Sequence, residues 1–166
     1  MNTALTITGL TKKYSNFVLD NISFSIPSGS IVGLIGENGA GKSTTINSIL
    51  GLIKKDSGKI TVLGHDIDTF DCAVKEKIGV VFDGSNFSEE LTPAKLSKVL
   101  RDIYSSWEQS YFNRLLDQLN IPATKKIKTF SKGMKMKLSI AVAFAHHPQL
   151  LILDEATSGL DPIVRD

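Results

Sequence analysis

The sequence lacks most features that mark secreted and membrane-spanning proteins. Its 166 residues contain one cysteine, Cys72, so an internal disulfide is excluded and the chain suits a reducing compartment. The first residues show no basic segment followed by an apolar one, so we expect no signal peptide. The longest apolar region near the end, residues 138–145, contains Ser139 and is too short to cross a bilayer. A role at a membrane would therefore require a partner protein.

The sequence also has no large excess of positive or negative charge. Nineteen basic and 17 acidic residues leave a formal net charge of +2, which is too small to indicate nucleic acid by itself. The lysines cluster between residues 125 and 137, where a solvated face is the default interpretation and a phosphate-facing surface the alternative. The length and an apolar content of 42% are typical of one globular domain with a substantial core.

What the sequence does have is a glycine-rich stretch between residues 31 and 44. An apolar run over residues 31–35 predicts a strand, and residues 44–50 are compatible with a helix. Four residues between them fit the pattern G-x-x-x-x-G-K-[ST], namely Gly36, Gly41, Lys42 and Ser43. At average residue usage, a chance match in a chain of this length should arise well under about one time in a hundred. The stretch therefore predicts a strand, a phosphate-binding loop and a helix.

Each residue type in this pattern has a physical role around a triphosphate. Glycines allow positive φ and close approach, so that consecutive backbone N–H groups form a concave anion site. That site opens onto the N-terminus of the following helix, whose unpaired N–H groups and partial positive charge favour phosphate. Lys42 would reach the β and γ phosphates, and the Ser43 hydroxyl would bind Mg²⁺. The sequence therefore predicts a nucleotide site.

The rest of the pattern predicts an α/β fold with a helical insert. Partial alternation of apolar and polar residues predicts two antiparallel strands, over residues 4–14 and 17–26. Further strands are predicted over residues 59–63, 78–82 and 150–153, and helices over residues 71–77, 92–104, 112–119 and 131–146. The last three helices have no strand between them, which suggests a helical insert in an α/β core.

Acidic residues follow two of the predicted strands. Asp83 stands after residues 78–82, at the carboxyl end of a strand, where ligands bind in open α/β sheets. Asp154 and Glu155 follow residues 150–153; alone, such a pair would more often be a helix cap or a solvated turn. Beside a phosphate loop, the pair predicts catalysis. Asp154 would hold Mg²⁺ through water, and Glu155 would orient and deprotonate the attacking water.

Together these segments resemble the ATP-binding domain of ABC (ATP-binding cassette) proteins, closest in character to those of bacterial exporters, and the resemblance covers the whole chain. The matching segments are Tyr14 for the adenine-stacking aromatic, residues 36–44 for the Walker A loop, 130–134 for the signature motif, 150–154 for Walker B, Glu155 for the catalytic glutamate and 158–161 for the D-loop.

The resemblance implies a fold class and a set of site residues. The fold would be α/β, a P-loop NTPase (RecA-like) core with an antiparallel β subdomain and an inserted α-helical subdomain. Within a single domain, residues 1–84 and 147–166 would form the nucleotide-binding core, and residues 85–146 the helical subdomain with the signature motif. The cofactors would be ATP and Mg²⁺. The implied nucleotide-binding residues are Tyr14, Gly36, Glu37, Asn38, Gly39, Ala40, Gly41, Lys42, Ser43, Thr44, Ser131 and Gly133; the metal ligands are Ser43, Asp83 and Asp154; the catalytic residue is Glu155.

Two of these assignments add to what the residues alone indicate. Tyr14 at a strand end would by itself be taken as a core aromatic, whereas the resemblance implies that it stacks on adenine. Ser131 can cap the following helix and Gly133 permits close approach, so the helix N-terminus can face a γ phosphate. In the family that phosphate belongs to the nucleotide of the other subunit. Lys132 and Met134 replace the glycine and glutamine of the family pattern, and neither change removes Ser131 or Gly133.

The sequence departs from the family pattern in two further places. Asp83 stands where most cassettes have a glutamine that senses Mg²⁺ and relays to the membrane partner; its shorter side chain can still ligate the ion. Residues 84–91 would then be the loop that meets a membrane subunit. No residue matches the family's switch histidine, since the dipole and capping at a helix C-terminus explain His146 and His147. We therefore expect a cassette that is incomplete on its C-terminal side.

The implied function is ATP binding and hydrolysis that power an ABC transporter, in the export direction. The partners would be a transmembrane permease subunit and a second cassette, in an ATP-dependent homodimer or heterodimer. The protein would be cytoplasmic and peripheral on the inner face of the cell membrane. One alternative is a cassette fragment with little or no hydrolysis, because the switch-histidine region is absent. A less favoured one is a soluble ABC ATPase acting on nucleic acid or ribosomes; against it stand the single cassette and modest charge, so no nucleic-acid partner is expected.

Overall fold

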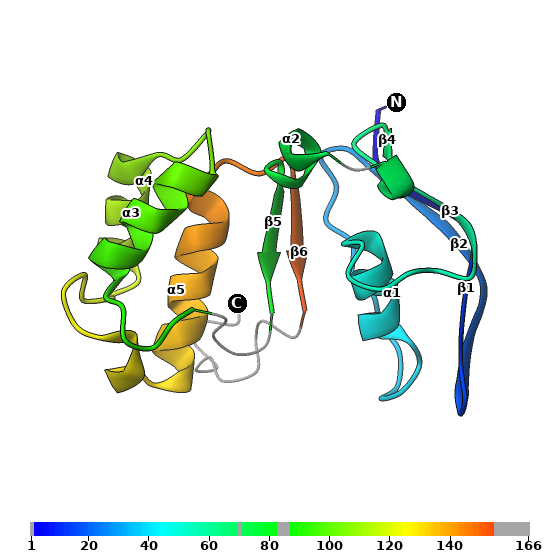
Figure 1. Cartoon of the computed structure of the whole chain (residues 1–166), viewed down its shortest axis with the longest axis horizontal. Helices are drawn as coiled ribbons and strands as arrows, with labels where there is room; N and C mark the ends of the chain where they lie inside the picture. Colours follow the sequence, from blue (N-terminus) through cyan, green and yellow to red (C-terminus); the bar gives the residue numbers. More distant parts are fainter. Residues whose placement is uncertain (1, 70, 83–86, 155–166) are drawn as a thin grey trace. The chain divides into compact units, whose positions relative to one another are not determined.

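The computed structural model describes residues 2–69, 71–82 and 87–154. The chain divides into two compact units, residues 1–75 and residues 76–166. Each unit has its own β-sheet (Figure 1). No helix within the described residues is both long enough and apolar enough to span a membrane.

The first unit is built on a four-stranded antiparallel sheet. Its strands are β1 (Thr3–Tyr14), β2 (Phe17–Pro27), β3 (Ser57–Val62) and β4 (His65–Asp66), in the order β2-β1-β3-β4. The strands β1 and β2 form the antiparallel pair that the sequence predicted, and Tyr14 pairs directly with Phe17 at its tip. Leu5, Ile7 and Leu10 of β1 are buried, because the strand lies between two neighbours and packs one face into the core.

The helix α1 (Lys42–Ile49) follows the glycine-rich loop and buries one side in the first unit. Its buried residues include Ile46 and Ile49, one turn apart, which places them on the same face of the helix. The unit continues with a 3-10 turn over Ile67–Thr69 and a short helix α2 (Cys72–Lys75). The predicted helix over residues 71–77 is therefore present in a shorter form, and the single cysteine is exposed.

The strand predicted over residues 31–35 is absent from the described structure. These residues are outside the β2-β1-β3-β4 sheet and are assigned no regular structure. Ile31 and Ile35 have 103% and 95% of their side-chain surface exposed. The prediction of a strand here was wrong because an apolar run forms a strand only where a neighbouring backbone pairs with it. No described strand of the first unit provides that pairing.

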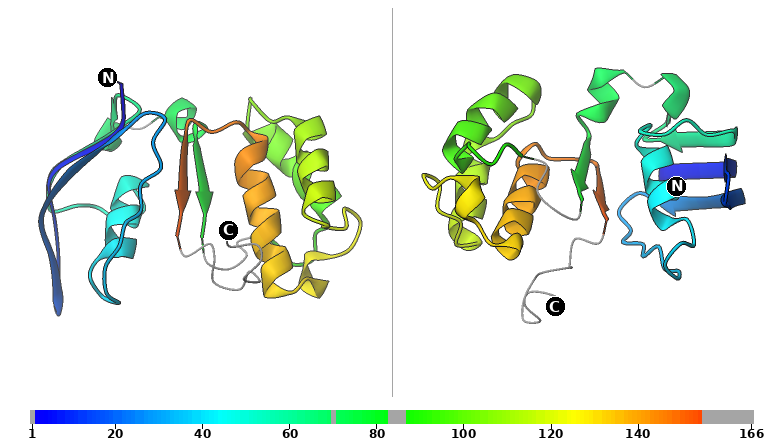
Figure 2. Two further views of the ribbon diagram at one scale, coloured as in Figure 1. Left: turned by 180° about the vertical axis from the view of Figure 1, so that it is seen from behind. Right: turned by 60° about the horizontal axis from the view of Figure 1, so that its bottom comes forward.

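The second unit combines a parallel pair of strands with three helices. The strands are β5 (Ile78–Val81) and β6 (Leu150–Leu153); the helices are α3 (Pro93–Ile103), α4 (Gln109–Gln118) and α5 (Lys132–Ala145). Figure 2 shows α5 beside β5, with α3 and α4 on the other side of α5. Val81 of β5 packs with Met136 and Ala143 of α5 in one buried cluster.

The helices begin and end close to the predicted positions because their capping signals are local. Thr92 accepts a hydrogen bond from the Lys95 N–H, and Pro93 occupies the first helical position of α3. The core of this part of the unit centres on Phe112, Ile127 and Leu138, each of which has 0% of its surface exposed. The helical spacing of apolar residues therefore predicted the three helices, and in α3 it correctly indicated Leu96 and Leu100 as buried but not Val99 and Ile103, which are exposed.

The lysine cluster lies on the surface and is partly paired with acidic residues. Lys126 and Lys128 each form an ion pair with Glu90, at 2.8 and 2.9 Å, and Lys135 pairs with Glu89. Exposed pairs of this kind contribute little to stability because water and salt screen them. The interpretation of the lysine cluster as a solvated face therefore fits these three lysines.

His146 ends α5 as its C-cap and is buried, with 2% of its surface exposed. Its ring stacks on Tyr104 with centroids 4.2 Å apart, and its Nδ1 atom lies 3.2 Å from the Val142 carbonyl oxygen. Burial lowers the pKa of His146, against smaller opposing effects that include the bond to Val142. The prediction that His146 lies at a helix C-terminus as part of its cap is confirmed, whereas its burial was not predicted. His147, by contrast, makes an exposed pair with Glu108 at 2.7 Å.

Two glycine substitutions in the first unit should differ sharply in their effect on stability. Gly58 has φ +91°, and a Cβ atom there would lie 2.6 Å from the Leu10 nitrogen and closer still to the Gly9 carbonyl. Gly64 has φ +83° and nothing within 4 Å. We expect Gly64→Ala to cost about 1 kcal/mol through its backbone conformation. Gly58→Ala should cost about 3 kcal/mol or more because backbone atoms must also move. Calorimetric unfolding of both variants tests this; equal losses would contradict it.

Replacing His146 by phenylalanine should remove part of the pH dependence of folding. Because burial lowers the pKa of His146 in the folded chain, the unfolded chain binds this proton first as the pH falls below about 6.5. The free energy of unfolding should therefore fall from pH 7 to pH 5, by up to about 1.4 kcal/mol per pH unit, in the parent and much less in His146→Phe.

Urea unfolding followed by the fluorescence of Trp107, the single tryptophan, measures this slope in the second unit. The carboxyl groups of Glu76 and Glu108 have lowered pKa values, owing first to hydrogen bonds from Ser105 and Ser110, so they titrate below this pH range. His65→Gln, which removes an exposed histidine of the first unit, provides the control. An unchanged slope in His146→Phe would contradict the assignment.

Candidate functional site

The predicted phosphate loop lies in the first unit, immediately before α1. Gly39 and Gly41 adopt φ values of +85° and +96°, in the left-handed region that favours glycine. The Ala40 N–H donates to the Glu37 carbonyl at 3.1 Å, which closes a turn at the tip of the loop. Residues 31–40 are exposed. The backbone geometry that the pattern requires is therefore present, and the loop is open to solvent.

Lys42 turns its side chain back over this loop. Its Nζ atom donates to the Gly36 carbonyl at 2.8 Å and to the Glu37 carbonyl at 2.9 Å. An ammonium group has three donors, so these two bonds leave one donor available. The contact places a positive charge at the loop itself, where an anion bound by the backbone N–H groups would lie.

The start of α1 has no side-chain cap. Gly41 occupies the N-cap position in the left-handed conformation, and no side chain accepts a hydrogen bond there. The first turn of a helix contains N–H groups that lack an intrahelical acceptor. An uncapped start offers these groups, together with the positive end of the helix dipole, to a bound anion. Ser43 lies in this first turn and its side chain is exposed.

Gly41 also marks a close approach between the loop and β2. A Cβ atom at Gly41 would lie 2.7 Å from Leu19 Cδ1 and 2.9 Å from Phe17 Cζ. The φ value of +96° favours glycine here, and a larger residue would also require the ends of the Leu19 and Phe17 side chains to move. The sequence predicted no part in the nucleotide site for Phe17 or Leu19. The hairpin pairing of Phe17 with Tyr14 is the signal that would have pointed to Phe17.

Tyr14 ends β1 at the tip of the hairpin and is not a core residue. It is 46% exposed, and Lys12 Nζ lies 5.5 Å from the centroid of its ring. The Phe17 ring lies beside it, with centroids 6.5 Å apart and planes inclined by 29°. The hairpin tip and the loop before α1 lie at the same end of the first unit (Figure 1). The structure thus brings together Tyr14, Phe17 and the phosphate loop.

In the second unit, Ser131 caps α5 as the sequence predicted. Its Oγ atom accepts a hydrogen bond from the Met134 N–H at 3.2 Å. Gly133 lies in the first turn, which contains no acidic residue. Ser131 uses an oxygen lone pair in this cap, so its O–H group can still act as a donor. The N-terminus of α5 therefore has the geometry to face an anion.

Asp154 directly follows β6 at the carboxyl end of the parallel pair. Its N–H donates to the Val81 carbonyl at 2.8 Å, which continues the pairing by one residue. Asp83, Glu155 and the D-loop residues 158–161 lie outside the described residues. Within the described ranges, no group of three or more His, Cys, Asp or Glu side chains is arranged to hold a metal ion.

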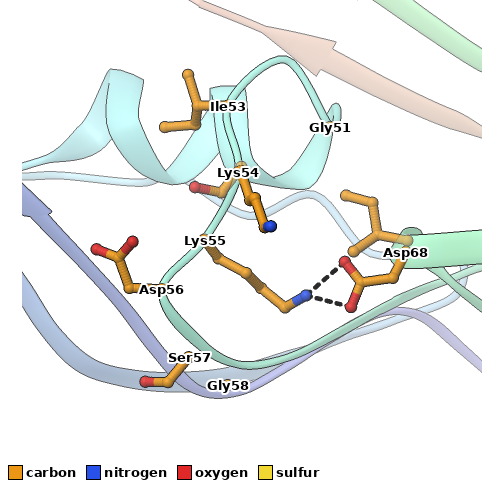
Figure 3. Close-up of a pocket in the computed structure, with 10 residues that line it drawn as sticks. Gly51, Ile53, Lys54, Lys55, Asp56, Ser57, Gly58 and Asp68 are labelled. Atoms are coloured by element: carbon orange, nitrogen blue, oxygen red, sulfur yellow. Dashed lines mark hydrogen bonds and ion pairs between the residues drawn. The ribbon is translucent and has the colours of Figure 1, made fainter.

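A separate cavity in the first unit, of about 580 Å³, lies away from the loop residues. It is lined by residues between Ser48 and Asp68 (Figure 3). Lys55 pairs with Asp68 across it. Asp56 accepts hydrogen bonds from the Lys13 N–H at 2.6 Å and from Lys12 Nζ at 3.3 Å, and the first of these chiefly lowers the pKa of its carboxyl group. Lys55, Asp56 and Asp68 each have a partner within the protein. We therefore interpret the cavity as structural and assign it no ligand.

Comparisons with known proteins agree with this arrangement. The model of the family described as ABC transporter matches residues 19–158. The chain is 38% identical over 166 residues to the bacitracin transport ATP-binding protein of Bacillus licheniformis, covering 98% of this chain and 54% of that protein. It is 37% identical over 168 residues to the Nod factor export ATP-binding protein I of Mesorhizobium japonicum, covering 98% of this chain and 49% of that protein.

A solved structure shows the same fold. It is the dimeric structure of a post-hydrolysis state of an ATP-binding cassette bound to ADP and Pi, with a TM-score of 0.82 and 25% identity. The match covers 96% of this chain and 77% of that one.

The chain spans about half the length of the curated relatives that it matches. The family match nevertheless includes the phosphate loop, the capped start of α5 and Asp154. The mixed α/β fold is that of the P-loop ABC ATPases. Loop geometry, fold and sequence similarity agree, and the chain belongs to the ABC transporter family as an ATP-binding subunit.

Proposed function

We propose that this chain binds and hydrolyses ATP to power a separate membrane permease, in the export direction. The observation that carries the proposal is the loop before α1, in which two left-handed glycines and an uncapped helix start accompany Lys42. This combination suits a polyphosphate because it offers backbone N–H groups, a helix dipole and one mobile cation.

The nucleotide would be held at both of its ends. Residues 36–44 would bind the phosphates, with the Lys42 ammonium exchanging its carbonyl partners for phosphate oxygens. The exposed face of Tyr14 would stack on the adenine ring. Ser131 and Gly133 would donate to the γ phosphate of ATP bound by a second cassette, through the N-terminus of α5.

The metal ligands proposed for Mg²⁺ are Ser43, Asp83 and Asp154. The exposed hydroxyl of Ser43 and the carboxylate of Asp154 at a strand end are hard oxygen donors, which fit this ion. When bound, Mg²⁺ would neutralise charge on the β and γ phosphates. Glu155 would act as general base: its carboxylate takes a proton from water as the water oxygen bonds to the γ phosphorus. The bond from that phosphorus to the bridging oxygen breaks, giving ADP and inorganic phosphate.

The partners proposed are a permease and a second cassette. Support for the cassette partner comes from the similar ATP-binding cassette solved as a dimer with ADP and Pi. Support for transport comes from the bacitracin transport relative, and support for the export direction comes from the Nod factor export relative. Within the described part of the chain no helix spans a membrane, so we propose that the subunit attaches through the permease to the cytoplasmic face of the cell membrane. The alternative function is ATP binding without turnover.

Lys42→Ala should weaken the binding of MgATP by about tenfold to a hundredfold, because it removes a charge-assisted bond to phosphate. Isothermal titration calorimetry of the whole chain measures the affinity. Lys54→Ala is the matched control, since Lys54 lies in the same unit and lines the other cavity. Equal affinities for the parent and Lys42→Ala would contradict the proposed site.

Glu155→Gln should lower the rate of ATP hydrolysis by about a hundredfold or more while leaving MgATP affinity close to that of the parent, because only the general base is lost. Phosphate release measured with excess ATP tests this. Asp102→Asn, an exposed acidic residue on α3, should retain the parent rate. Tight binding with no turnover in the parent chain would favour the binding-only alternative.

A further inference from the structure

Phe17 contacts both parts of the proposed nucleotide site. It is the first residue of β2 and is half-buried. Sequence analysis gave it no role beyond membership of a strand. The edge of its ring lies next to Gly41 at the start of α1, and its ring also lies beside Tyr14. Both contacts lie within the first unit.

The contact with α1 is close and leaves no free space. A Cβ atom on Gly41 would lie 2.9 Å from Phe17 Cζ and 3.6 Å from Phe17 Cε1. The ring therefore lies next to Gly41, where the phosphate loop becomes a helix. Residues 31–40, which precede this point, are exposed and belong to no described strand. The contact with β2 is thus an important constraint on where the loop ends and α1 begins.

The contact with Tyr14 is set by the hairpin. Tyr14 and Phe17 pair directly in the register of β1 and β2, and their ring centroids are 6.5 Å apart. Tyr14 is 46% exposed, whereas Leu19, the other β2 residue against Gly41, is 4% exposed. Phe17 therefore lies near both Gly41 and the half-exposed Tyr14 ring.

We propose that Phe17 is a positioning residue that aligns the Tyr14 ring with the phosphate loop, so that one ATP molecule can engage both. The inference rests on the proposed function, since it concerns how ATP is held. A ligand with two linked binding groups gains affinity from the second contact only when the two sites are correctly spaced. Removing the Phe17 ring frees the start of α1 to shift relative to the hairpin tip, so the two sites lose their alignment.

The experiment compares a ligand that needs both sites with one that needs only the loop. MgATP carries adenine and phosphates, whereas magnesium tripolyphosphate carries phosphates alone. In Phe17→Ala, MgATP affinity should fall by about tenfold, the scale expected when a base loses its aromatic stack. Tripolyphosphate affinity should stay within about twofold of the parent. A similar loss for both ligands would overturn the inference, because it would mean that Phe17 only supports the loop.

A double-mutant cycle gives a readout that a purely structural role would not produce. If Phe17 acts through Tyr14, Phe17→Ala should weaken MgATP binding in the parent and have no further effect in a Tyr14→Ala chain. Additive losses would overturn the inference. Phe24→Ala is the matched control: Phe24 is a half-buried aromatic on the same strand and pairs with Ile7 instead. It should leave MgATP affinity unchanged.

Two further measurements separate loss of folding, and failure of the proposed function, from failure of this inference. Thermal unfolding shows whether Phe17→Ala remains folded. If it does not, Phe17→Leu keeps apolar volume against Gly41 and should show a smaller loss, again confined to MgATP. A parent chain that binds no MgATP would overturn the proposed function and this inference with it. A parent that binds MgATP, with Phe17→Ala behaving identically, would overturn this inference alone.

Discussion

The contact of Phe17 and Leu19 with Gly41 ties the start of α1 to strand β2. Gly41 has a left-handed backbone, and a Cβ atom there would lie within 3 Å of both side chains. The start of α1 and the tip of the β1–β2 hairpin therefore lie at the same end of the first unit (Figure 1). The turn at Ala40 and the two bonds from Lys42 then hold the loop together through its own backbone. The groups that we propose to bind phosphate are backbone N–H groups, whose direction this geometry determines.

In the second unit, a capping residue defines each end of α5, Ser131 at the first and His146 at the last. At the first end, Ser131 caps the helix and keeps an O–H donor, so a structural bond and a ligand contact are compatible in one side chain. At the other end, His146 is buried against Tyr104, and desolvation lowers its pKa despite the backbone hydrogen bond to Val142 that favours the cation. Between these ends, Leu138 and Ala141 are fully buried in the helical core. The helix is therefore anchored by its apolar face, while its first turn remains available.

Prediction from sequence succeeded where a local signal is strong. The pattern Thr92-Pro93 predicted the start of α3, and apolar residues at helical spacing predicted α4 and α5. It failed where the outcome depends on distant residues. The apolar run over residues 31–35 predicted a strand that the structure does not contain. A strand needs a neighbouring backbone to pair with, and a run of apolar residues does not specify that neighbour. For the same reason, residues near Tyr14 could not reveal that its ring is half exposed.

By itself, the sequence determined the residue types of the phosphate loop, the caps of α3 and α5, and membership of the ABC transporter family, because these depend on short patterns in fixed order. Only the tertiary structure decided that Phe17 lies next to Gly41, that Tyr14 is half exposed, and that His146 is buried against Tyr104. The contacts of Phe17 with Gly41 and of His146 with Tyr104 join residues far apart in the chain. Such contacts depend on how strands and helices pack, which no single short pattern records.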